Sequence, residues 1–202
     1  MGDASVTLRI SGGRRLRSPV GTVARPTASR VRLAVMNLLA DRLRGCRWLD
    51  PCCGSGVMAC EALQRGAAAV VAIERDPGVA ALARQNLEAV AAGISGREIA
   101  QRPVVAVHRG DALRWLVGGP QARQLDRFDL IYLDPPWQAD LHGRLTEAVA
   151  RGGWLARGGV LIWECPSDAV PAVPVGWNPM SPRRYGGTTV LLLEPNESPR
   201  DL

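Results

Sequence analysis

Short apolar runs of strand length alternate with helical segments from residue 46 onward, and this alternation most constrains the fold. The runs are apolar at most successive positions and lie at 46–50, 68–74, 103–108, 128–134 and 159–164. Strands buried on both faces have this pattern, whereas strands with one exposed face alternate polar and apolar residues. The pattern therefore predicts an α/β fold with a mostly parallel sheet and helices on both faces.

Helices are expected between these strands. A stripe of apolar residues at helical spacing covers 31–39, where Thr27 or Ser29 can cap the helix and Gly45 can end it. Asp76 followed by Pro77 is typical of a helix start and predicts a helix to about residue 92. The remaining expected elements are helices at 57–66, 112–116 and 139–150 and a last strand at 188–194.

Positive charge is concentrated near the N-terminus. The net charge is +6, and residues 1–50 hold ten arginines against three aspartates. Between residues 9 and 32 there are seven arginines and no acid: Arg9, Arg14, Arg15, Arg17, Arg25, Arg30 and Arg32. This asymmetry predicts a polyanionic partner, with a solvated basic tail as the alternative. We expect residues 1–45 to form a basic extension, a hairpin or arm and a helix, that binds this partner, and residues 46–202 to form the α/β domain.

Length and composition set further bounds. The 202 residues are 47% hydrophobic and 22% charged, which is usual for a globular domain. The longest apolar stretch, 67–73, is too short to span a bilayer, so a soluble cytoplasmic protein without a membrane partner is expected. The five cysteines form no CxxC pair and neither histidine lies near them, so no metal site is expected.

The motif DPCCGSG at residues 50–56 stands between the first strand and the next helix. Its glycines allow a ligand to approach the backbone closely, and the helix that follows offers free N–H groups. Glu74 lies twenty residues after Gly54 at the end of the second strand, where a carboxylate accepts hydrogen bonds from ribose hydroxyls. The pair predicts a nucleoside cofactor, and NAD is one candidate.

Asp50 helps to choose between cofactors. A carboxylate at this strand end is a poor neighbour for the pyrophosphate of NAD, but it suits the ammonium and sulfonium charges of S-adenosylmethionine (SAM). Asp111 of the sequence GDA, after the third strand, is placed to accept from an adenine amine, although a helix cap explains it equally well. The candidate cofactor-binding residues are Asp50, Gly54, Ser55, Gly56, Glu74, Arg75, Asp111 and Ala112.

The motif DPPW at residues 134–137 follows the fourth strand directly. Its two prolines fix the backbone and remove two N–H donors, which leaves the Asp134 carboxylate and the Pro135 carbonyl as acceptors. Trp137 adds an aromatic plane on which a base can stack. Acceptors of this kind can hold the exocyclic amine of a flat base for methyl transfer. The candidate catalytic residues are therefore Asp134, Pro135, Pro136 and Trp137.

The order DPCCGSG, Glu74, GDA and DPPW resembles that of SAM-dependent amino-methyltransferases acting on nucleic-acid bases. The flanking sequences ISGGRRLRSP, near the N-terminus, and RYGGT, at 184–188, narrow the resemblance to the bacterial 16S ribosomal RNA guanine-N2 methyltransferase D family. It covers about residues 8–194. The family usually has Leu-Phe-Ala where this chain has Pro51-Cys52-Cys53, and Tyr where it has Trp137.

The resemblance implies a Rossmann-like SAM-dependent methyltransferase fold with a mostly parallel seven-stranded sheet and a short basic N-terminal extension. It also implies SAM as cofactor, a guanine N2 amine of 16S rRNA in small-subunit particles as substrate, and a monomer. Three alternatives stay open: an adenine-N6 methyltransferase of DNA or RNA, an NAD-dependent oxidoreductase and a non-catalytic RNA-binding module.

Overall fold

The computed structural model describes residues 8–18, 29–94 and 102–196. The chain divides into two compact units, residues 1–115 and 116–202. Each unit holds part of the α/β architecture. Among the described residues, no helix is both long enough and apolar enough to cross a membrane.

The first unit is built on three parallel strands. They are β3 (Arg47–Asp50), β4 (Ala69–Glu74) and β5 (Val104–Arg109), in the order β5-β4-β3. In their register Asp50 pairs with Ala72 and Glu74 pairs with Arg109. The polar ends of β3 and β4 therefore meet at one edge of the sheet, which is where ligands bind in folds of this kind.

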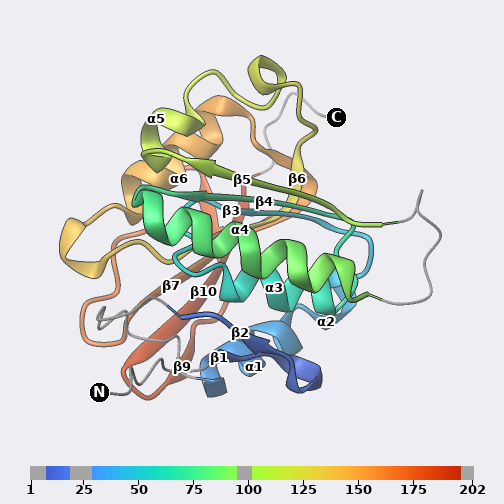
Figure 1. Cartoon of the computed structure of the whole chain (residues 1–202). Coiled ribbons are helices and arrows are strands. Elements are labelled where there is room, and N and C mark those ends of the chain that lie inside the picture. Colours follow the sequence, from blue (N-terminus) through green and yellow to red (C-terminus); the bar gives the residue numbers. More distant parts are fainter. Residues whose placement is uncertain (1–7, 19–28, 95–101, 197–202) are drawn as a thin grey trace. The chain divides into compact units, whose positions relative to one another are not determined.

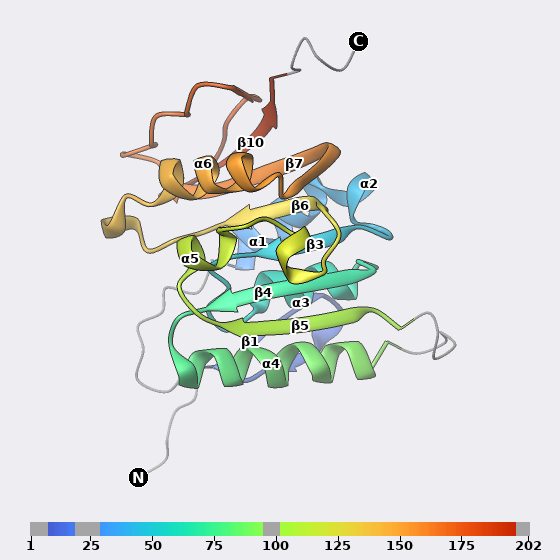
Figure 2. The same ribbon diagram turned by 90° about the horizontal axis from the view of Figure 1, so that it is seen from above.

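Helices connect these strands on both faces. Helix α3 (Val57–Gln64) packs against α4 (Pro77–Ala92) below the strands in Figure 1, and α5 (Ala112–Leu116) lies above them. The view in Figure 2 shows the same arrangement from above. Helix α4 begins as the sequence predicts, because the Asp76 side chain accepts a hydrogen bond from the Val79 amide at 2.8 Å.

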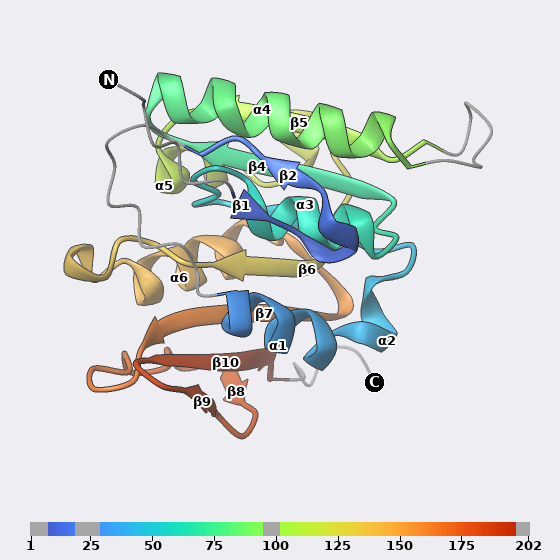
Figure 3. The same ribbon diagram turned by 60° about the horizontal axis from the view of Figure 1, so that its bottom comes forward.

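The N-terminal segment joins the core of the first unit. Strands β1 (Leu8–Arg9) and β2 (Arg15–Leu16) form an antiparallel pair around the 3-10 turn η1 (Ser11–Gly13), and we call residues 8–17 the hairpin. Ile10 and Leu16 are buried. Figure 3 shows the hairpin beside α3 and α4. The division at residue 45 stays a prediction, but the described part of this segment packs against the rest of the unit.

The expected helix over 31–39 forms as two helices. Helix α1 covers Ser29–Leu38, and α2 covers Ala40–Leu43. The break falls at Leu39, whose backbone leaves helical geometry at φ −99° and ψ 7° while its side chain stays buried. Of the two cap residues expected for this helix, Ser29 begins α1, and Thr27 lies outside the described residues.

The second unit combines parallel and antiparallel pairing. Strand β6 (Phe128–Leu133) runs parallel to β7 (Leu155–Pro166), and β10 (Thr188–Pro195) runs antiparallel to β7. The short strands β8 (Trp177–Pro179) and β9 (Arg183–Tyr185) each pair antiparallel with β10. Among the described residues, the strands from β3 to β10 number eight, one more than the seven expected, and the additional one is the short β9.

Helix α6 (His142–Gly152) begins three residues later than the sequence predicts. The residues before it form the 3-10 turn η4 (Trp137–Ala139), and Asp140 has a left-handed backbone with φ +44°. A non-glycine residue in this conformation interrupts a helix, so α6 starts only after it. Another 3-10 turn, η3 (Gln121–Arg123), precedes β6.

Candidate cofactor site and catalytic loop

The cofactor loop, residues 50–56, crosses from β3 to α3. Its backbone turns through Gly54 at φ +51° and Gly56 at φ +76°, a region that side chains disfavour. A Cβ at Gly56 would also lie 3.4 Å from the Cβ of Ala83 on α4. A Cβ at Gly54 would meet nothing within 4 Å, so the space over the loop is open for a ligand.

Asp50 is the last residue of β3 and the first residue of this loop. It is 2% exposed, and its Oδ1 accepts a hydrogen bond from the Cys52 amide at 3.3 Å. Next to it, burial raises the pKa of the Cys53 thiol well above its ordinary value, and the charges of Asp50 and Glu74 raise it further. Cys53 therefore stays protonated at neutral pH and is not a nucleophile there.

Glu74, at the end of β4, contacts the cofactor loop with which the sequence analysis grouped it. Its Oε2 accepts a hydrogen bond from the Gly54 amide at 3.1 Å, and its Oε1 accepts one from the Asp76 amide at 2.8 Å. A carboxylate has about four lone-pair sites. The half-buried side chain therefore keeps acceptor capacity for a pair of ribose hydroxyls while it holds the cofactor loop in place.

Asp111 lies at the end of the third strand of the first unit. The Gly110 amide donates to the Glu74 carbonyl at 2.9 Å, which connects this turn to the end of β4. The exposed Asp111 side chain accepts a hydrogen bond from the Arg114 amide at 3.0 Å, so it caps α5. One carboxylate can make this cap and still offer its second oxygen to an adenine amine.

The catalytic loop, residues 134–137, follows β6 in the second unit. Pro135 is buried, Pro136 is exposed, and Asp134 and Trp137 are partly exposed. Burial raises the pKa of Cys165 on β7 to about 11, and the nearby charges of Glu164 and Asp134 contribute to the shift. Asp134 is thus close enough to the end of β7 for its charge to act there.

Comparison with known proteins identifies the family. Residues 8–194 match the family described as Conserved hypothetical protein 95. The chain belongs to this family. It is 30% identical over 181 residues to the ribosomal RNA small subunit methyltransferase D of Escherichia coli (strain K12), an alignment that covers 87% of this chain and 84% of that protein. The protein of the same name from Haemophilus influenzae is 25% identical over 185 residues, covering 92% of this chain and 90% of its own.

Solved structures agree with this assignment. A putative methyltransferase from Escherichia coli matches with a TM-score of 0.77 at 28% identity, covering 94% of this chain and 98% of its own. An RNA methyltransferase from Salinibacter ruber, solved in complex with S-adenosyl-L-homocysteine, matches with a TM-score of 0.60 at 20% identity over 88% of this chain and 98% of its own. The expected family and the Rossmann-like methyltransferase fold are confirmed.

The N-terminal arginines of this family member divide into two groups. Arg9, Arg15 and Arg30 are exposed. Arg14, which is partly exposed, and Arg17, which is exposed, use their guanidinium groups on α4, where they donate to the Ala89 carbonyl at 2.9 Å and to Gln85 Oε1 at 3.0 Å. Arg25, also expected to bind RNA, lies outside the described residues.

Arg32 corrects the sequence prediction. It is 5% exposed, and its Nη2 donates to the Arg9 carbonyl at 2.7 Å. Its Nε lies 3.9 Å from Oε1 of Glu61, which is also buried. A guanidinium paired inside the fold is not available to RNA phosphates, so Arg32 supports the hairpin instead.

The sequence did not predict a buried polar cluster that is formed by residues of β6, α6 and β7 in the second unit. The Tyr132 hydroxyl donates to Glu164 Oε2, and Nε2 of His142 lies 2.9 Å from the Glu164 carbonyl. Burial lowers the pKa of His142, which keeps the ring neutral, and since a carbonyl only accepts, Nε2 must be the donor. The one available signal was a glutamate in the otherwise apolar run at 159–164.

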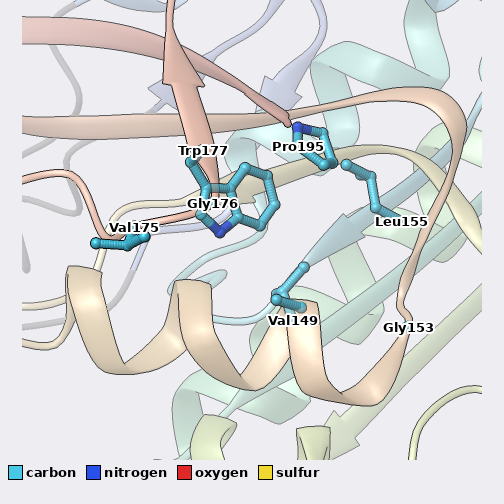
Figure 4. A pocket seen from close by; sticks show the side chains of 8 residues that line it. Val149, Gly153, Leu155, Val175, Gly176, Trp177 and Pro195 are labelled. Atoms are coloured by element: carbon cyan, nitrogen blue, oxygen red, sulfur yellow. The ribbon is translucent and has the colours of Figure 1, made fainter. Parts of the chain in front are cut away.

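A pocket in the second unit lies away from the catalytic loop. Val149, Leu155, Trp177 and Pro195 are among the apolar residues around it, as Figure 4 shows. Leu155 is the first residue of β7, whereas Asp134 follows the last residue of the parallel strand β6. The pocket is therefore at the opposite end of these strands from the candidate chemistry.

Proposed function

We propose that this chain transfers a methyl group from SAM to the N2 amine of a guanine in the 16S rRNA of small ribosomal particles. The observation that carries the proposal is Glu74, which holds the cofactor loop through the Gly54 amide, also binds the Asp76 amide at the start of α4, and keeps acceptors for a ribose. The names of the relatives, rRNA small subunit methyltransferase D, support an RNA substrate of this kind.

The residues of the first unit fit SAM. Glu74 would accept from the ribose hydroxyls with Arg75 beside it, and Asp111 and Ala112 would face the adenine edge. Asp50, Gly54, Ser55 and Gly56 would surround the methionine end. When bound, SAM supplies an electrophilic methyl group on a sulfonium. The buried Asp50 carboxylate suits that cationic end and is unfavourable next to a dinucleotide pyrophosphate, which argues against the NAD-dependent alternative.

The residues of the catalytic loop would position the target amine. Its lone pair is delocalised into the base, so it is a weak nucleophile. The Asp134 carboxylate and Pro135 carbonyl would accept its two N–H groups and favour the tetrahedral geometry needed for attack. A carboxylate is too weak a base to remove an amine proton in advance, so Asp134 would orient the amine while the N–C bond forms and the C–S bond of the sulfonium breaks. The methylated nitrogen would then be cationic and acidic, and its proton would pass to the Asp134 carboxylate. Trp137 would stack on the base, and Pro136 would hold the loop rigid.

Single-turnover methyl transfer to small-subunit particles that lack the modification tests this proposal. Asp134→Ala should lower the rate by about 10²–10⁴-fold, because it removes a contact that is strongest in the transition state. Asp140→Asn is the matched control, since it removes a carboxylate shortly after the catalytic loop and asparagine tolerates the left-handed backbone there. Its rate should stay near wild type.

Mass spectrometry of the modified nucleoside separates the alternatives. N2-methylguanosine in the small-subunit rRNA supports the proposal, whereas N6-methyladenosine supports the second methyltransferase hypothesis. A wild-type rate for Asp134→Ala would show that DPPW is a structural turn. The expected cytoplasmic location and monomeric state stay predictions. Size-exclusion chromatography with light scattering tests the monomeric state.

A further inference from the structure

A buried asparagine connects the hairpin to the cofactor loop. Asn86, in the middle of α4, is 3% exposed. Its Nδ2 donates to the Ser55 carbonyl at 3.0 Å and to the Arg17 carbonyl at 3.0 Å, and its Oδ1 accepts from the Arg17 amide at 2.9 Å. Both N–H groups of the side chain are used. One side chain thus binds the cofactor loop and the end of the hairpin at the same time.

The chemistry of this link requires an asparagine. Its amide pairs with both backbone groups of Arg17, as a neighbouring strand would, and its remaining N–H reaches Ser55. An aspartate would place an oxygen opposite two carbonyls, and an apolar residue would leave buried backbone groups without partners. One helical turn earlier, Ala83 packs against Gly56, so α4 supports the loop at two adjacent positions.

Other hydrogen bonds of the described hairpin residues attach the hairpin to helices. The Ser11 amide donates to Glu61 Oε1 on α3 at 3.1 Å. The guanidinium groups of Arg14 and Arg17 reach Ala89 and Gln85 on α4. These contacts attach the hairpin to the helices, whereas Asn86 joins it to residues that face the cofactor site.

We propose that Asn86 is a positioning residue that couples the hairpin to the cofactor loop, so that cofactor binding orders the hairpin and RNA binding at the hairpin strengthens cofactor binding. The RNA half of this inference rests on the proposed function, and the cofactor half needs only the loop. A ligand that holds Ser55 also holds the Asn86 side chain, and through it both backbone groups of Arg17. Coupling between two binding sites is reciprocal, so each ligand raises the affinity for the other by the same factor.

Hydrogen–deuterium exchange of the full chain, with and without S-adenosylhomocysteine, tests the cofactor half. In the wild type, the ligand should slow amide exchange both in residues 50–56 and in residues 8–17. In Asn86→Asp at saturating ligand, residues 50–56 should stay protected and the ligand-dependent protection of residues 8–17 should be lost. Gln85→Ala is the matched control: it removes an exposed bond to Arg17 on the same helix, and it should keep the wild-type response.

Binding measurements test the RNA half. The dissociation constant of S-adenosylhomocysteine, measured with and without small-subunit RNA, should differ by at least about fivefold in the wild type and in Gln85→Ala. In Asn86→Asp the ratio should fall to about one. A merely structural role for Asn86 would lower the melting temperature and leave this ratio unchanged. Asn86→Ser, which adds no charge, serves if Asn86→Asp does not fold.

The outcomes separate the two proposals. Protection of residues 50–56 without any effect on residues 8–17 in the wild type would overturn the coupling and leave the proposed function intact. Loss of the coupling in Gln85→Ala as well would overturn the role given to Asn86. No binding of S-adenosylhomocysteine to the wild type would overturn both the proposed function and this inference.

Discussion

At the scale of single residues, Glu74 serves two purposes at once. Its two oxygens hold the amides of Gly54 and Asp76, and the same oxygens are the proposed ribose acceptors. Glu74→Ala should weaken SAM binding by about 2–3 kcal/mol, the cost of losing a pair of hydrogen bonds to a charged acceptor. Isothermal titration calorimetry measures this loss. Glu88→Ala, an exposed glutamate on α4, is the control, and equal affinities for the two variants would refute the assignment.

Residues with a local signal could be predicted from the sequence, and residues with distant partners could not. Glycines at 54 and 56, the Asp76 cap and Glu74 have roles set by the strand–turn–helix pattern around them. Arg32 and Asn86 look like ordinary surface residues of amphipathic helices. Their partners, Glu61 for one and Arg17 with Ser55 for the other, lie far away in sequence, so only the fold reveals that both side chains are buried.

At the scale of elements, α6 is fixed to β7 by His142. The ring lies 5.2 Å from Trp163 between centroids, and Nε2 contacts the Glu164 carbonyl. The lowered pKa means that the folded protein binds this proton less readily than the unfolded chain. The stabilisation is therefore complete above the ordinary histidine pKa of about 6.5 and is lost as the pH falls below it.

The direction of this pKa shift gives a prediction for the variant His142→Gln. At pH 7.5 the variant should be less stable by about 1–3 kcal/mol, because a buried hydrogen bond is lost, and its melting temperature should fall by about 2–4 °C per kcal/mol. Between pH 7.5 and 5 its melting temperature should decrease less steeply than that of the wild type. Differential scanning calorimetry at several pH values measures both effects. If the melting temperatures of the wild type and the variant decrease in parallel as the pH falls, His142 does not take up a proton on unfolding.

The types of element were predictable, and their boundaries were less so. The apolar runs correctly predicted β3 to β7 and β10, because burial on both faces leaves a direct sequence signal. The start of α6 was wrong by three residues because it depends on the left-handed Asp140, a conformation that aspartate adopts without a fixed signal. The first four residues of β7 were also missed, since Leu155–Gly158 includes an exposed arginine and a glycine.

At the scale of the whole molecule, the net charge is +6, and all of the positive excess comes from the first quarter of the sequence, where ten arginines stand against three aspartates. The structure divides the arginines of that quarter by their contacts. Arg14, Arg17 and Arg32 bind groups within the first unit, although Arg17 is exposed, and Arg9, Arg15 and Arg30 are exposed as well. Composition alone predicted a polyanion partner but could not tell these two groups apart, because the contacts of an arginine depend on the fold.

Arg9, Arg15 and Arg30 should carry the phosphate contacts with RNA, because the guanidinium groups of the other three arginines bind groups within the first unit. Replacing Arg9, Arg15 and Arg30 by alanine should weaken RNA binding and make the log–log dependence on salt shallower by about two to three units, because each contact releases nearly one counterion.

Arg127, Arg151 and Arg157 are also exposed, and they lie near the amino ends of β6 and β7, away from the catalytic loop. Replacing these three causes the same change in net charge, so the salt slope should stay close to that of the wild type if binding is localised. Filter binding at several salt concentrations measures both slopes, and calorimetry with SAM confirms that each variant is folded. Equal slopes for the two triple variants would show that net charge alone attracts the RNA and that the hairpin region is a solvated basic surface.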